Sequence, residues 1–136
     1  MTKHEAKFTS KFITWLLYNG ESVVGESFPW EAKISLDNKP INFKSGFRDH
    51  QIPTLIQARD KVHAYKVSDM DQMSKPFDGT FFCKAPSYIV MHWIRKGNKT
   101  FYLINPKQIA LLIEQGHKSL TEVMADSICD YKGEVR

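Results

Sequence analysis

The chain has 136 residues, of which 42% are hydrophobic and 25% are charged. This is the composition of a folded globular protein, and it excludes an intrinsically disordered one. The length predicts a single domain over residues 1–136, and the formal net charge of +4 gives weak support for a polyanionic partner.

Targeting signals and cysteine usage bear on the compartment. The first residues lack the basic stretch, apolar run and cleavage site of a signal peptide. The longest apolar run, SYIVMHWI at 87–94, is too short to cross a bilayer, so we expect no membrane partner. Cys83 and Cys129 have no CxxC spacing, which argues against a disulfide framework or a zinc ribbon. We therefore expect a cytoplasmic protein.

The first predicted elements are a helix and a strand. Thr2 and Glu5 have the spacing of a capping box, and apolar residues from Phe8 onward lie on one helical face, which predicts a helix over 3–18. Asn19-Gly20 would end it. Alternating apolar and polar residues then predict a strand over 27–35, followed by a polar loop.

The middle of the chain predicts a second helix over 49–60, with Asp49 as its cap and Pro53 in its first turn. The segment VHAYKV, residues 62–67, has the β-branched and aromatic content of a strand inside the sheet. Two further strands follow a turn-rich segment, at 80–83 and 87–94.

The last third begins with a strand at 100–104, which the turn RKGNK joins to the preceding strand as a hairpin. Asn105, Pro106 and Gly116 have the positions of an N-cap, a first helical residue and a helix stop. Ser119 and Glu122 have capping-box spacing and predict a short final helix. The order α-β-α-β-β-β-β-α-α indicates an α/β fold, a mixed β-sheet flanked by α-helices.

The segment WEAKIS carries the first chemical signal. Glu31 and Lys33 are two residues apart on a predicted strand, so their side chains share a face. Mg²⁺ takes one or two carboxylates together with carbonyl oxygens and waters, and Glu31 with the carbonyl of Ala32 would supply part of such a shell. Lys33 would then orient a water or offset charge on a phosphate. The alternative is an ordinary strand with two solvated charges on a wet face.

Two other segments offer supporting groups. Asp78 in KPFDG leads into a strand and would bring a second carboxylate, although Pro, Asp and Gly are also ordinary turn residues. Gln51 lies near a helix start, where phosphates bind readily, but such a residue is more often simply solvated. His50 lacks a second His or a Ser at recognisable spacing, and Glu5 is explained by the capping box.

Three segments taken in order, WEAKIS, FRDHQIPTL and HAYKV, resemble the PD-(D/E)xK nuclease superfamily. In particular they are similar to the RecU-type Holliday junction resolvases and related small phage-encoded nucleases, over roughly residues 5–105. The resemblance implies a restriction-endonuclease-like fold and a Mg²⁺- or Mn²⁺-dependent DNA endonuclease in a bacterial or phage-infected cell. It assigns the E-x-K carboxylate to Glu31, the lysine to Lys33, the helix glutamine to Gln51 and the first-helix acid to Glu5.

One part of the superfamily pattern is missing. The usual aspartate on the strand before E-x-K has no counterpart in YNGESVVGESFPW, where only Glu21 and Glu26 are acidic. We therefore predict a permuted site in which Asp78 supplies this carboxylate from another strand. The predicted metal ligands are then Glu31, Asp78 and the carbonyl of Ala32.

The expected partner is DNA, possible substrates being branched DNA or, for a restriction or repair nuclease, a linear duplex. A junction resolvase makes two symmetric cuts, which predicts a homodimer. The alternative is a catalytically inactive nuclease fold that binds DNA or protein. The residues predicted to contact phosphates are Lys11, Lys44, Arg48, Arg59, Lys61 and Lys66.

Overall fold

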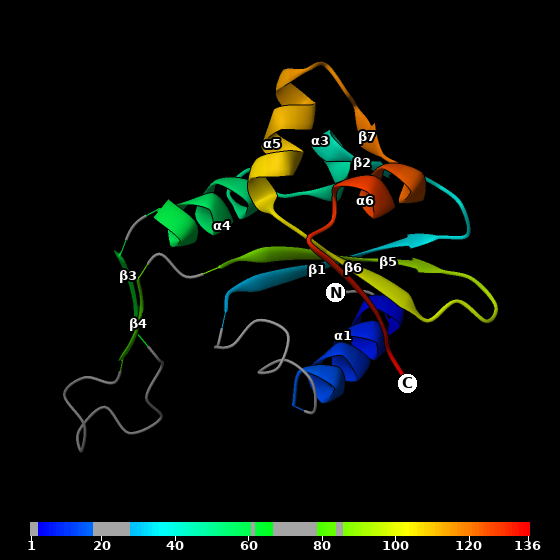
Figure 1. Ribbon diagram of the computed structural model, residues 1–136, viewed down its shortest axis with the longest axis horizontal. Helices are drawn as coiled ribbons and strands as arrows, with labels where there is room; N and C mark the ends of the chain where they lie inside the picture. Colours follow the sequence, from blue (N-terminus) through cyan, green and yellow to red (C-terminus); the bar gives the residue numbers. More distant parts are fainter. Residues whose placement is uncertain (1–2, 18–27, 61, 67–78, 84–85) are drawn as a thin grey trace.

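A computed structural model describes residues 3–17, 28–60, 62–66, 79–83 and 86–136, and for 62–66 and 79–83 it describes the backbone alone. Its central element is a four-stranded mixed sheet (Figure 1). The strands are β1 (Trp30–Leu36), β5 (Tyr88–Ile94), β6 (Thr100–Ile104) and β8 (Tyr131–Glu134), in that spatial order. The strand β1 runs parallel to β5, and the other neighbours are antiparallel. The predicted α/β class, a mixed sheet flanked by helices, is confirmed.

One face of the sheet is covered by α1 (Lys3–Trp15), as Figure 1 shows. Phe8 and Phe12 of this helix are almost fully buried against Ala32, Val90 and Phe101 of the sheet. The apolar stripe read from the sequence is therefore the packing face of α1. Since Ala32 belongs to this face, its neighbours Glu31 and Lys33 on β1 point to the opposite face.

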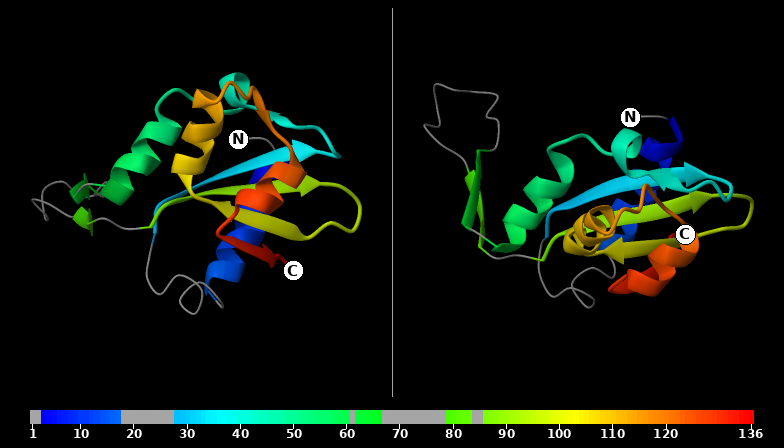
Figure 2. Two further views of the ribbon diagram at one scale, coloured as in Figure 1. Left: turned by 45° about the horizontal axis from the view of Figure 1, so that its top comes forward. Right: turned by 90° about the horizontal axis from the view of Figure 1, so that it is seen from above.

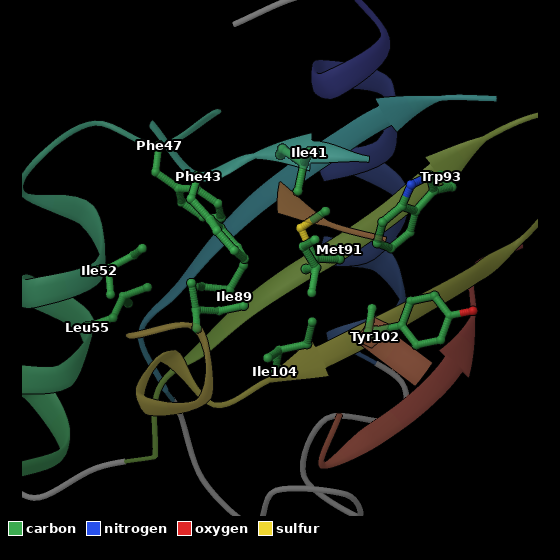
Figure 3. Close-up of a cluster of buried hydrophobic side chains, with 13 residues drawn as sticks. Ile41, Phe43, Phe47, Ile52, Leu55, Ile89, Met91, Trp93, Tyr102 and Ile104 are labelled. Atoms are coloured by element: carbon green, nitrogen blue, oxygen red, sulfur yellow. The ribbon is translucent and has the colours of Figure 1, made fainter. Parts of the chain in front are cut away.

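The opposite face carries the larger core and is covered by helices from later in the chain (Figure 2). These are α3 (Phe43–Gly46), α4 (Gln51–Asp60), α5 (Pro106–Glu114) and α6 (Glu122–Ile128). Ile89, Met91 and Trp93 of β5 alternate into this core and have no exposed surface (Figure 3). The strand β5 is thus buried on both faces, which explains the unbroken apolar run of SYIVMHWI.

Local signals account for the ends of several elements. The side chain of Asn105 accepts a hydrogen bond from the Lys107 N–H at 3.0 Å, Pro106 opens α5, and Gly116 adopts φ 91° just past its end. The β5–β6 hairpin turns at Gly97, with φ 78°. These conformations favour the residues found there, and the predicted helix and hairpin are confirmed.

Other expectations were wrong in detail. The cap of α6 is Thr121, whose hydroxyl accepts from the Met124 N–H at 3.2 Å, whereas Ser119 lies in β7 (Ser119–Leu120). The helix α4 begins at Gln51, two residues after Asp49, the predicted cap, and the Gln51 side chain accepts from the Arg48 N–H at 2.9 Å. Thr2, Asn19 and Gly20 lie outside the described residues.

The segment VHAYKV does not join the central sheet. The strand β3 (Val62–Lys66) pairs with β4 (Gly79–Cys83) as a separate antiparallel ribbon beyond the end of α4 (Figure 1). Short pairing between β2 (Ile41–Asn42) and β7, and the whole of β8, also went unpredicted. Composition favours a strand but does not select its partner, which long-range packing decides.

Along the part of the chain described here, no helix combines the length and apolar character required to cross a bilayer.

Candidate functional site

The site forms where the start of β1 meets the start of α4. Glu31 and Lys33 project from β1 toward the face opposite α1, which α3 to α6 cover. The Lys33 Nζ lies 3.5 Å from the Glu31 Oε1. Their side chains are 34% and 14% exposed, respectively. A lysine this covered is not a solvated charge on a wet face, so this alternative from the sequence does not describe Lys33.

Gln51, the first residue of α4, completes the cluster. Its Nε2 donates to the Glu31 Oε1 across 2.8 Å, and its Oε1 accepts from the Arg48 N–H at 2.9 Å. Because one contact needs a donor and the other an acceptor, the orientation of the amide is determined by its surroundings. The sequence singled out Glu31, Lys33 and Gln51 separately, and the fold brings them to one carboxylate oxygen.

Phe47 holds the lysine from the other side. The Lys33 Nζ lies 5.4 Å from the centroid of the Phe47 ring, within the range of a cation–π contact. Phe47 is only 6% exposed and belongs to the core beneath α3 and α4. Sequence reasoning missed this residue, because an apolar residue in a polar connection does not indicate which charge it will contact.

An open hollow of about 370 Å³ lies beside the cluster. Glu31 and Gln51 line it together with His50, Thr54 and the start of β1. The N-terminus of α4 lies at this hollow, and the positive end of the helix dipole favours negative charge there. The arrangement gives a ligand access to one carboxylate, one amide and one histidine.

The donor set partly fits a hard divalent cation. The Glu31 Oε1 is engaged by Gln51 and Lys33, while its Oε2 has no hydrogen-bond partner among the residues that the structure describes. One carboxylate with a main-chain carbonyl, such as that of Ala32, meets the minimum that Mg²⁺ takes from proteins. Within the described ranges, however, no three His, Cys, Asp or Glu side chains gather closely enough to hold a metal.

Asp78, the predicted second carboxylate, lies outside the described residues, as do Glu21, Glu26 and Lys61. Lys66 ends β3, where only the backbone is described. The permuted site therefore stays a prediction.

Glu5 does not belong to this cluster, and its assignment was wrong. It lies on α1, which packs on the face of the sheet opposite to Glu31. Its neighbours His4 and Phe8 lie beside Ile94, at the other end of the parallel pair β1 and β5. A helix that is first in the chain has no local signal for the face it will cover.

Arg59 was predicted to grip phosphates, but its guanidinium is engaged inside the protein. Its Nε and Nη2 donate to the carbonyl of Ser87 at 2.9 and 2.5 Å, and it lies 5.0 Å from the centroid of Tyr88. Ser87 is fully buried, and its hydroxyl donates to the Leu55 carbonyl. Arg59 therefore joins α4 to the start of β5.

The remaining predicted DNA contacts divide between the two faces. Arg48 is exposed just before α4, where its N–H binds Gln51, and Lys44 is exposed on α3. Lys11 is exposed on α1, on the far side of the sheet.

No protein-family model matches this sequence, and the searches of curated proteins and of solved structures find no match either.

Proposed function

We propose that the protein is a Mg²⁺- or Mn²⁺-dependent DNA endonuclease with its site at Glu31, Lys33 and Gln51. The observation that carries the proposal is the convergence of these side chains on the Glu31 Oε1, at 2.8 Å for Gln51 and 3.5 Å for Lys33. They are three of the four residues to which the resemblance assigned the nuclease chemistry, the fourth being Glu5. The proposal places the protein in the cytoplasm.

Each residue has a stated role. Glu31 and the carbonyl of Ala32 would hold the cation, with Asp78 as the proposed second carboxylate. The bound cation lowers the pKa of water and offsets phosphate charge. Lys33 orients the attacking water, and Gln51 fixes the Glu31 carboxylate. Lys44 and Arg48 contact the phosphate backbone next to the site.

A second function is supported by the single described carboxylate at the site. Since Glu31 is the only Asp or Glu that lines the hollow among the described residues, the donor set there is smaller than that of a two-carboxylate nuclease. A catalytically inactive module that binds DNA or protein would have this appearance. The two functions differ in cleavage.

The deciding experiment is cleavage of a labelled four-way junction and of a linear duplex of the same sequence, with Mg²⁺, Mn²⁺ or chelator. Glu31→Gln, Lys33→Met and Asp78→Asn should each lower the cleavage rate by about 100-fold or more, the size expected when a charge-stabilising group is lost. Cutting of the junction in preference to the duplex would make the protein a resolvase.

Matched controls replace an exposed glutamate and an exposed lysine that lie outside the site. Glu114→Gln changes an exposed residue at the end of α5, and Lys132→Met changes an exposed residue on β8, at the opposite edge of the sheet from β1, so cleavage should stay at the wild-type rate. If wild type binds DNA but cuts neither substrate with either metal, the binding module is the correct function. If Asp78→Asn alone retains full activity, the permuted carboxylate is wrong.

A resolvase also requires two sites related by a two-fold axis, so this specific role predicts a homodimer. Light scattering on the purified protein, alone and with junction DNA, measures this directly. If the protein binds the junction only as a monomer, it is not a resolvase, and the proposed activity is reduced to that of a nuclease that makes single cuts.

A further inference from the structure

A second concentration of positive charge lies on the α1 face of the sheet, far from Glu31. It surrounds a hollow of about 350 Å³ between α1 and the turn that joins β5 to β6. Glu31 pairs with Ile89, and Ile94 lines the hollow, so the two places are separated by about 17 Å along β5. We call it the hairpin pocket, and its basic residues are His4, Lys7, Lys11, Arg95, Lys96 and Lys99.

Both walls of the hairpin pocket are held in place. Phe8 of α1 stacks on His92 of β5, with 4.6 Å between ring centroids and 7° between planes. In the turn, the Asn98 side chain donates to the Trp93 carbonyl at 2.6 Å and the Asn98 N–H donates to the Arg95 carbonyl at 3.0 Å. The lysines therefore project from a fixed frame.

Most of this charge is not neutralised within the protein. No Asp or Glu lines the pocket in the described part of the chain, and Lys7, Lys11, Lys96 and Lys99 are exposed and have no carboxylate within ion-pair distance there. Arg95 is the exception, since it forms a bidentate pair with Glu122. Elsewhere Lys33, Lys107 and Lys132 each have a carboxylate partner at 3.5, 2.6 and 2.9 Å.

The position of this charge is unfavourable for the isolated protein. His4, Lys7 and Lys11 follow one stripe of α1, and His4 lies in its first turn, where the helix dipole is already positive. Lys96 and Lys99 add to the same field from the turn. Glu5 in the first turn offsets part of it. A bound anion would relieve the remaining repulsion.

We propose that the hairpin pocket binds the phosphate backbone of DNA as a second contact surface, on the face of the sheet opposite Glu31. Four unpaired lysines on two elements suit a row of phosphates, because ammonium groups act as point charges without directional recognition. The choice of DNA as the ligand rests on the proposed endonuclease function, but binding at the hairpin pocket requires neither metal nor cleavage. Lys11 was already predicted to contact DNA, whereas Lys7, Lys96 and Lys99 were not singled out from the sequence.

The test is the salt dependence of binding to a labelled duplex, measured by fluorescence anisotropy in chelator. The variant carries Lys7→Gln, Lys96→Gln and Lys99→Gln together, and the control carries Lys107→Gln, Lys118→Gln and Lys132→Gln, which changes the net charge equally. Each lost phosphate contact lowers the slope of log K against log salt by about 0.9, so the pocket variant should lose about 2 to 3 units of slope and at least tenfold in affinity. The control should keep the wild-type slope.

Two results would overturn the proposal. An unchanged slope in the pocket variant, or an equal fall in both variants, would show that the pocket does not contact DNA. The second result concerns tripolyphosphate as a competitor. If tripolyphosphate binds wild type as tightly as the duplex does, and displaces the duplex from wild type but not from the pocket variant, the pocket is a site for small phosphates instead. Thermal unfolding checks that each variant is folded. Binding by Glu31→Gln without cleavage separates this surface from the nuclease site.

Discussion

The side-chain amide of Gln51 links Glu31 on β1 to the backbone of Arg48, donating to the carboxylate at 2.8 Å and accepting from the N–H at 2.9 Å. Through this one residue the start of α4 fixes the orientation of the proposed metal ligand. The link crosses 20 residues of sequence and depends on how α4 packs over the sheet.

Gln51→Leu should therefore affect activity more than stability. Loss of its two hydrogen bonds at a half-exposed position lowers the free energy of unfolding by about 1 to 2 kcal/mol. Cleavage should fall by about tenfold or more, since the Glu31 carboxylate is no longer oriented. Urea unfolding and single-turnover cleavage measure the two effects, with Gln57→Leu on the exposed side of the same helix as the control. A loss of stability with cleavage intact would show that Gln51 is only structural.

Arg59→Ala should destabilise the fold rather than selectively weaken DNA binding. The substitution removes charged hydrogen bonds to the Ser87 carbonyl and leaves it short of donors in a buried position, at a cost of about 2 to 3 kcal/mol. Arg48→Ala removes the same charge from an exposed position and should change stability by less than about 0.5 kcal/mol. Denaturant unfolding of both variants decides the matter. Equal stabilities, with DNA affinity lost only in Arg59→Ala, would restore its predicted phosphate contact.

His92 should make stability depend on pH between 7 and 5. Burial lowers the pKa of His92 below 6.5, against the opposing effects of the hydrogen bond to the Thr100 carbonyl and of Glu122. The unfolded chain therefore binds the proton more readily than the folded protein. The contribution of His92 to the free energy of unfolding is fully present above about pH 6.5, and below that pH it decreases by at most about 1.4 kcal/mol per pH unit. Lys11 and Arg95 act in the same direction as burial.

His92→Asn keeps a donor for the Thr100 carbonyl but does not titrate, so the slope between pH 7 and 5 should flatten. Its absolute stability will also be lower, because the stacking on Phe8 is lost. His117→Asn changes an exposed histidine and serves as the control. Chemical unfolding across the pH series gives both slopes. A His92→Asn slope equal to that of wild type would contradict the assignment.

Gly133→Ala should loosen β8 from the sheet. An added Cβ would lie 2.6 Å from the Phe101 Cζ, and Phe101 is fully buried, so the ring has little room to move. Overpacking of this kind costs about 1 to 3 kcal/mol. Glu134→Ala, the next residue on the same strand, should be nearly neutral. Thermal unfolding of the pair measures the difference, and equal midpoints would mean that Phe101 is free to shift.

Local signals in the sequence determined the elements whose physics is local. Asn105, Pro106 and Gly116 set the limits of α5 through hydrogen bonding and backbone preference within a few residues. Gly97 closes its hairpin for the same reason. The alternation in WEAKIS placed Glu31 and Lys33 on one face of β1, because side chains of a strand alternate regardless of their neighbours.

Only the tertiary structure decided which elements meet. It placed α1, and Glu5 with it, on the far side of the sheet, turned Arg59 inward to Ser87, and removed β3 from the central sheet. It also joined α1 to the β5–β6 turn, which gathers the lysines of the hairpin pocket. Periodicity tells which face of an element is apolar, whereas the partner of that face depends on the burial that the whole chain achieves at once.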